Sequence, residues 1–152
     1  MTTTKLGLVK PLDGNTSWGD DYRNAMDAID AWAVKNETRG IAFYIGGEIE
    51  VAMVASFKAP MALKALLANI EVDVAPVDAD LIVDVKKNGT TIFTTTANRP
   101  TVTAGNTSAV SNAPDVQAIA QHDKITIEII QVGSTTAGSN LSLTLVCEVE
   151  SS

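Results

Sequence analysis

The sequence predicts a mainly β protein: an antiparallel, jelly-roll-like β-sandwich preceded by an N-terminal extended arm and one short α-helix. Three observations predict this fold class. Short runs rich in β-branched residues recur after residue 40, separated by Gly, Asn, Pro and Ser. The pair Asn88-Gly89 suits a two-residue hairpin turn, because both central residues of such a turn need positive φ. Before residue 40, apolar residues recur instead with a helical period.

Length and charge limit the organisation and the partners. The chain has 152 residues, 45% of them hydrophobic, which is enough to bury one core, so we expect an N-terminal arm and helix (1–40) and one β-sandwich domain (41–152). It has no apolar run typical of a secretory signal or a membrane span, so we expect a soluble, unprocessed protein. The formal charge of −7 argues against nucleic acid and membranes as partners.

The N-terminal segment is expected to contain an arm followed by a helix. Pro, Gly and Asn punctuate residues 1–15, which indicates an extended, loop-like arm. A serine followed three residues later by an aspartate predicts that the helix begins near Ser17. The segment from Asn36 to Gly40 is expected to end it.

One face of this helix is apolar and forms the candidate site. Its residues recur at spacings of 4, 3, 4 and 3: Trp18, Tyr22, Ala25, Ile29 and Trp32. An isolated helix of this length is marginal in water, so the face must lie against another surface. It either packs back on its own β-domain or docks on another molecule, and the two tryptophans near the chain tip favour docking. We therefore predict that these residues form an attachment or oligomer interface.

The β-domain is expected to contain six strands. These are residues 48–57, 60–75, 80–85, 90–96, 124–132 and 141–149. Residues 60–75 begin with a helical spacing of leucines and then alternate, and the strands on either side favour the strand interpretation. In the last run, Leu141, Leu143, Leu145, Cys147 and Val149 share one face.

No residue pattern indicates catalysis, a metal site or a cofactor. The only histidine, His122, cannot form a multi-histidine site within one chain and is expected in an exposed turn. The single cysteine, Cys147, forms no internal disulfide and is expected in the core rather than as a nucleophile. Four aspartates lack the spacing of a calcium loop and are expected on solvated strand edges: Asp73, Asp78, Asp80 and Asp84. From the sequence we therefore expect that this protein is not an enzyme and binds no cofactor or metal.

Three stretches resemble structural proteins of tailed bacteriophages. The runs "ADLIVDVKKNGTTIFTTTANRPTVTAG" (79–105) and "DKITIEIIQVGSTTAGSNLSLTLV" (123–146) resemble a β-sandwich domain found repeatedly in such proteins. The opening "LGLVKPLDGNTSWGDDYRNAMDAIDA" (6–31) resembles the N-terminal segment of phage fibre and fibre-like proteins. There a Leu-Val-Lys-Pro stretch leads through a Trp-Gly step into a helix.

The resemblance implies a compact module of a virion, often trimeric, that attaches to a capsid or tail by its N-terminal part. Long fibres continue into repeats or a large receptor-binding tip, whereas this sequence carries one β-domain. It is therefore similar to a capsid decoration protein, a short spike or the base of a head or tail fibre. The implied localisation is the virion, and the implied partners are copies of itself in a homotrimer and other virion proteins of the capsid, portal, collar or tail.

A receptor-binding or glycan-binding module of a phage fibre is the alternative function, with a host surface glycan as its partner. Sugar faces usually stack on exposed Trp or Tyr. The β-region offers only Phe43, Tyr44, Phe57 and Phe93, and its phenylalanines are expected in the core. Loops such as residues 133–140 leave glycan binding open without indicating it. The predicted function is accordingly that of a non-enzymatic structural protein that docks through its N-terminal segment.

Overall fold

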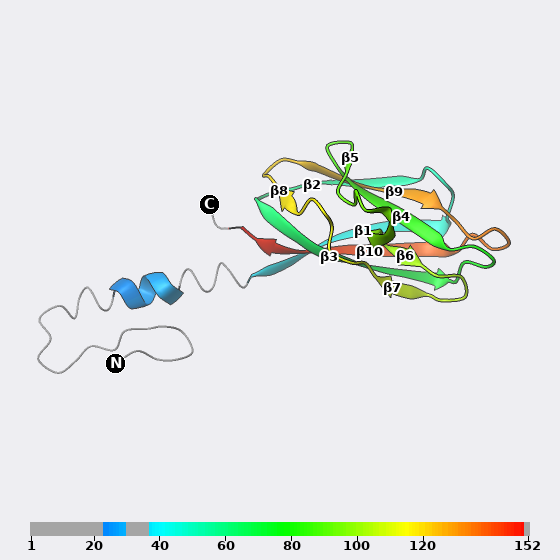
Figure 1. Cartoon of the computed structure of the whole chain (residues 1–152), viewed down its shortest axis with the longest axis horizontal. Coiled ribbons are helices and arrows are strands. Elements are labelled where there is room, and N and C mark those ends of the chain that lie inside the picture. The colour runs from blue at the N-terminus through cyan, green and yellow to red at the C-terminus, as the bar shows by residue number, and fades with distance from the viewer. Residues whose placement is uncertain (1–22, 30–36, 151–152) are drawn as a thin grey trace, which may run out of the picture.

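The computed structural model describes residues 23–29 and 37–150. Residues 23–29 are helical, and residues 37–150 form two antiparallel β-sheets packed face to face (Figure 1). The mainly β fold with a sandwich and one helix, predicted from the sequence, is confirmed.

Each sheet contains five strands. The first sheet has the order β1-β10-β3-β7, with β8 also paired to β3. Its strands are β1 (Thr38–Glu48), β3 (Leu63–Val74), β7 (Ser108–Val110), β8 (Ala118–Ile119) and β10 (Ser139–Val149). The second sheet has the order β2-β9-β4-β5, with β6 also paired to β4. Its strands are β2 (Val54–Lys58), β4 (Leu81–Lys87), β5 (Thr90–Thr91), β6 (Thr101–Val102) and β9 (Lys124–Gln131).

The path of the chain between the sheets is that of a jelly roll. Strands β1 to β4 alternate between the first and the second sheet. The short strands β5 and β6 both pair with β4, and the short strands β7 and β8 both pair with β3. When each of these two pairs is counted as one strand, the chain alternates between the sheets again from β7 onward. Counted in this way, β5 with β6 and β7 with β8, each sheet has four strands and the whole has the eight of a jelly roll. Strands β1 and β2 both lie at sheet edges, on the same side of the sandwich.

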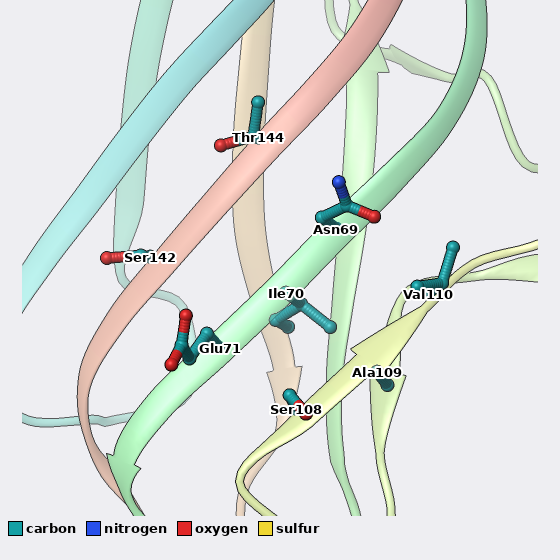
Figure 2. Close-up of a pocket in the computed structure, with 8 residues that line it drawn as sticks. All are labelled: Asn69, Ile70, Glu71, Ser108, Ala109, Val110, Ser142 and Thr144. Carbon is teal, nitrogen blue, oxygen red and sulfur yellow. The ribbon is translucent and has the colours of Figure 1, made fainter.

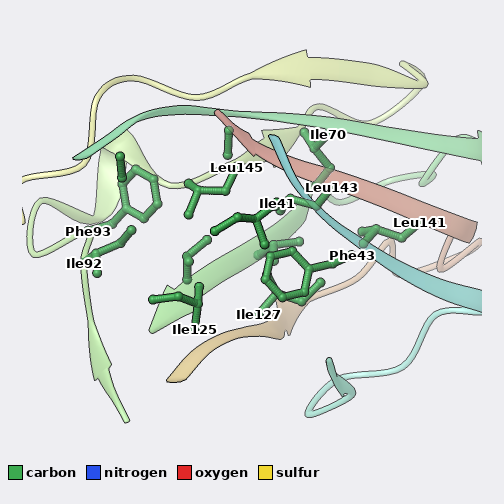
Figure 3. Close-up of a cluster of buried hydrophobic side chains, with 14 of the residues drawn as sticks. Ile41, Phe43, Ile70, Ile92, Phe93, Ile125, Ile127, Leu141, Leu143 and Leu145 are labelled. Atoms are coloured by element: carbon green, nitrogen blue, oxygen red, sulfur yellow. The ribbon is translucent and has the colours of Figure 1, made fainter. Parts of the chain in front are cut away.

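A single core fills the space between the sheets. Ile41 and Phe43 of β1 and Leu143 of β10 point inward from the first sheet, opposite Ile125 and Ile127 of the second (Figure 3). All five side chains are at most 5% exposed. Because successive side chains of a strand point to opposite faces, the same strands present polar residues to the outside.

Four predicted strands are confirmed. Residues 60–75, 80–85, 124–132 and 141–149 correspond to β3, β4, β9 and β10. On β10 the predicted inward face is buried up to Cys147, and Val149 is partly buried. The predicted hairpin turn is also confirmed, because Asn88 and Gly89 have φ of 50° and 88° and Lys87 pairs with Thr90.

The predicted strand at residues 48–57 is confirmed only for residues 54–57, which belong to β2. Strand β1 ends at Glu48, β2 begins only at Val54, and the chain turns between them. The turn contains Ala52, whose φ of 69° interrupts the extended backbone. The apolar residues that suggested a strand are explained in part by burial within this turn, because Ile49 is fully buried in the core.

The predicted strand at residues 90–96 is mostly wrong. Only Thr90–Thr91 is extended, and a short 3-10 helix follows at η1 (Thr96–Asn98). The Thr91 hydroxyl accepts a hydrogen bond from the Phe93 amide at 3.1 Å, which turns the chain out of the strand. Ile92 and Phe93 are nevertheless fully buried, so these apolar residues belong to the core without being part of a strand.

Strand β1 was missed by the sequence interpretation. Its inward residues Ile41, Phe43 and Ile45 alternate with outward residues, which is the signal that could have revealed it. The expected end of the helix within residues 36–40 stays a prediction, because residues 30–36 lie outside the described residues; Thr38 already belongs to β1 and pairs with Glu148. The division into residues 1–40 and 41–152 stays a prediction.

Candidate functional site

The predicted apolar interface of the N-terminal helix falls only partly within the described residues. Trp18, Tyr22 and Trp32 lie outside them. Ala25 and Ile29 lie one turn apart on the helix at residues 23–29, and Ile29 is 37% exposed. Met26, on the same short helix, is 40% exposed. The interface therefore stays a prediction, with Ala25 and Ile29 on one helix face as expected.

His122 and Cys147 occupy the positions that the sequence predicted. His122 is exposed in a turn, with a φ of 74°. Cys147 is fully buried, and this burial raises the pKa of its thiol from an ordinary 9.0 to about 11. Such a thiol is almost entirely protonated near neutral pH and is a poor nucleophile.

The four aspartates of the β-domain do not meet at a common point. Asp73 and Asp78 accept hydrogen bonds from Asn140 and Thr135, whereas Asp80 accepts one from the Ala104 amide. Asp84 is the exception to the predicted solvated positions, because it is 2% exposed and pairs with Arg99. Within residues 23–29 and 37–150, no three His, Cys, Asp or Glu side chains are placed to hold a metal ion.

A shallow groove of about 290 Å³ crosses the outer face of the first sheet (Figure 2). Two cross-strand rows line it. In one row Thr144 of β10 pairs with Asn69 of β3, and in the other Ser142 pairs with Glu71. Strand β7 closes the groove with Ser108 and Val110. The lining is thus mostly hydroxyl, amide and carboxylate groups, with one exposed apolar side chain at Val110.

Tyr44 lies on the same outer face, next to this groove. It pairs with Ser142 across β1 and β10, and its side chain is 64% exposed. Its hydroxyl lies 3.4 Å from Asn140 Oδ1, which also accepts a hydrogen bond from the Gly47 amide at 2.7 Å. The amide of Asn140 in turn donates to Asp73 at 2.8 Å. This network holds Asn140 between β1 and β3.

A second hollow, of about 540 Å³, lies where β2 ends and β9 begins. Its lining residues come from these two strands and the turn before β9: Ser56, Phe57, Lys58, His122 and Lys124. Lys58 and Lys124 are direct partners across the two strands. The hollow is therefore lined by two ammonium groups, an imidazole and an aromatic ring, and by no carboxylate.

A third hollow, of about 190 Å³, opens beside the second and shares Phe57 with it. It lies between the starts of β1 and β3, and its lining is mainly apolar: Arg39, Gly40, Ile41, Phe57, Pro60, Met61 and Leu63. Phe57 and Met61 are each 38% exposed, so the prediction that all phenylalanines are core residues is wrong for Phe57. Phe43 and Phe93 are buried as predicted.

Sequence comparisons gave no match, either to protein-family models or to curated proteins. None of the helical segments described here has the length and apolarity needed to cross a membrane. The remaining comparison is with solved structures.

One similar structure is a chain of the "Cyanophage Pam1 capsid asymmetric unit", with a TM-score of 0.50 and 15% identity. The alignment covers 75% of this chain and 84% of that one, so the two chains are similar in length. Another is the Podospora anserina GH26-CBM35 β-(1,4)-mannanase, with a TM-score of 0.35, 10% identity, and coverage of 78% of this chain and 27% of that one. The first similarity supports the fold, and the second is too weak to support an argument.

Proposed function

We propose that this chain is a non-enzymatic structural protein of a phage virion, which docks on the capsid or tail through its N-terminal segment and displays the β-sandwich. The observation that carries the proposal is the shared fold with a chain of similar length in a cyanophage capsid. The N-terminal sequence, which resembles that of phage fibre proteins, also supports it.

The role within the virion that we favour rests on the fold of the described residues 37–150, which form one jelly roll. We therefore favour a decoration protein, short spike or fibre base.

Mass spectrometry of purified particles tests the proposal directly. The expected result is peptides of this chain in particles that remain after density-gradient purification, at a copy number that is constant between preparations. Absence from washed particles that contain all their other structural proteins would contradict the proposal.

We further propose that the protein is a homotrimer. An apolar helix face that is only marginally stable alone, and a sandwich whose two sheets each have unpaired edge strands, both gain from association of copies. Light scattering of the full-length protein at micromolar concentration should give three times the chain mass of 16.0 kDa. A monomer mass would contradict self-assembly.

A glycan-binding module is the second candidate function. Tyr44 favours it, because this exposed ring adjoins a groove lined by hydroxyl, amide and carboxylate groups. A glycan array with the full-length protein tests it, with Tyr44→Ala as the variant that should lose any binding. Signals that are identical for both proteins, or no signal at all, would count against this function.

A further inference from the structure

Lys58 and Lys124 form a cationic pair without a matching anion. They face each other directly across β2 and β9, an arrangement that destabilises a sheet when the charges are alike. The ion pairs found within residues 37–150 involve Arg39, Lys86 and Arg99, but neither of these two lysines. In a chain with a net charge of −7, a local excess of positive charge requires an explanation.

The carboxylate next to Lys124 in the sequence, that of Asp123, forms no ion pair with either lysine. Asp123 precedes Lys124, yet its oxygens accept hydrogen bonds from the Asn88 side chain at 2.7 Å and from the Ala120 amide at 2.8 Å. The bond from Asn88, and to a smaller extent the bond from Ala120, lowers the pKa of Asp123. Both bonds hold the carboxylate in the turn. Asp123 does not line the hollow beside the lysines.

Apolar surface continues from the lysines to the start of β1. Phe57 lines both the cationic hollow and the apolar hollow, and Met61 lies in the latter. We call these two hollows together the base surface, because they lie at the end of the sandwich where β1 begins and β10 ends (Figure 1). A partner that fits the base surface has apolar side chains flanked by carboxylates.

The N-terminal helix has this chemistry. Met26 and Ile29 are its exposed apolar residues, and Asp27 is exposed beside them. In the sequence the same segment also carries Asp20, Asp21 and Asp30, against the single cation Arg23. The helix is thus acidic and apolar, whereas the base surface is cationic and apolar.

We propose that the base surface of one copy binds the N-terminal helix of a second copy. Among the described residues, the apolar side chains of both surfaces are exposed: Met26 and Ile29 on the helix, and Phe57 and Met61 on the base surface. Contact would place Asp27 near Lys58 and Lys124, with Met26 and Ile29 in the neighbouring hollow.

This inference rests on the proposed function in one respect, namely that copies of the chain assemble. Residues 30–37 connect the helix to β1 and can span at most about 29 Å, so the receiving copy must stand directly beside the donor. Exchange of helices between adjacent copies then joins the copies of the assembly.

A charge-swap experiment tests the inference. The surface variant carries Lys58→Glu and Lys124→Glu, and the helix variant carries Asp27→Lys and Asp30→Lys, both in the full-length chain. Each alone places like charges in the proposed contact, so each should associate at least about tenfold more weakly than the unchanged protein. An equimolar mixture should recover association in part, because two of the three contacts in a mixed trimer then join opposite charges.

Sedimentation velocity measures association, and fluorescence provides a second readout. Both tryptophans, Trp18 and Trp32, flank the described helix, so quenching by acrylamide reports on this segment alone. Quenching should increase in each variant and decrease in the mixture. The control variant, Lys64→Glu with Lys87→Glu, has the same net charge as the surface variant but lies outside both hollows, and should behave as the unchanged protein.

Two results would overturn the inference. One is unchanged association of both variants while circular dichroism shows them to be folded. The other is rescue only when all four changes are in one chain and not in the mixture, which would mean that the helix binds its own β-domain. Particle mass spectrometry is independent of both, so a failure of the proposed virion function can be told apart from a failure of this contact.

Discussion

Arg99 Nε lies 3.3 Å from Asp84 Oδ1, and the Asp84 side chain is only 3% exposed. Asp84 is on β4 but points away from the core, where the segment from Thr91 to Arg99 covers it. Thr91 donates a hydrogen bond to the same carboxylate oxygen at 2.6 Å. The two contacts fasten both ends of this segment to the outer face of the second sheet.

Replacing Asp84 with Ala should destabilise the protein strongly. The change leaves the Arg99 guanidinium largely buried without its counter-charge, and breaking one partner of a buried pair costs about 3–5 kcal/mol. Urea unfolding followed by circular dichroism measures the loss. Glu128→Ala removes the ion-pair partner of Lys86. Because the Glu128 side chain is more exposed than that of Asp84, this change should cost about 1 kcal/mol or less. Equal losses for the two variants would contradict this account.

Gly133 should not tolerate even a methyl group. A Cβ there would lie 1.9 Å from the Thr136 carbonyl oxygen and 2.7 Å from the Val77 amide nitrogen, both of them backbone atoms. Gly133→Ala should therefore lower the free energy of unfolding by at least about 1–3 kcal/mol. Gly46→Ala is the matched control, because its Cβ would meet only the Tyr44 ring at 3.2 Å, and its melting temperature should stay within a few degrees of the parent.

Cys147 should make stability fall at high pH. The folded-state pKa of about 11 exceeds the ordinary 9.0, so the unfolded chain loses its thiol proton first. The contribution of Cys147 is therefore complete below pH 9 and is lost as the pH rises toward 11. Unfolding free energies measured across this range should decline less in Cys147→Val. A parallel decline in both proteins would exclude the thiol as the cause.

Replacing Ile29 with Asp should separate attachment from folding. The new charge would enter the apolar helix face and cost several kcal/mol if that face is desolvated on docking, whereas the sandwich from Ile41 onward should still fold. Incorporation into particles should therefore fail while the melting temperature of the β-domain is kept. Normal incorporation of a folded variant would mean that attachment runs through the β-domain, and global unfolding would make the helix part of the core.

The sequence predicted the elements whose pattern depends on one buried face. Leu141, Leu143 and Leu145 alternate because one side of β10 meets the core, and this periodicity is local. By contrast, Ile49 and Phe93 are buried by turns whose course depends on distant contacts, so an alternating pattern there led to wrong strands.

The candidate surfaces were harder to predict, because they depend on strand register. Lys58 and Lys124 are 66 positions apart in the numbering and become neighbours only through the pairing of β2 with β9. Likewise, nothing local to Asp84 indicates that Arg99 is its partner. The acidic, apolar helix was visible in the sequence, but the surface that complements it was not.

The position of β10 between β1 and β3 has a consequence for biosynthesis. Ile41 pairs with Leu145, so a nascent chain must be extended by about a hundred residues before β1 gains its neighbour. Until β10 leaves the ribosome, β1 and β3 expose apolar faces and unpaired backbone, which is the condition that invites aggregation. The first sheet can therefore be completed only after β10 has been synthesised, and chains in which β10 is not yet in place are open to aggregation through β1 and β3.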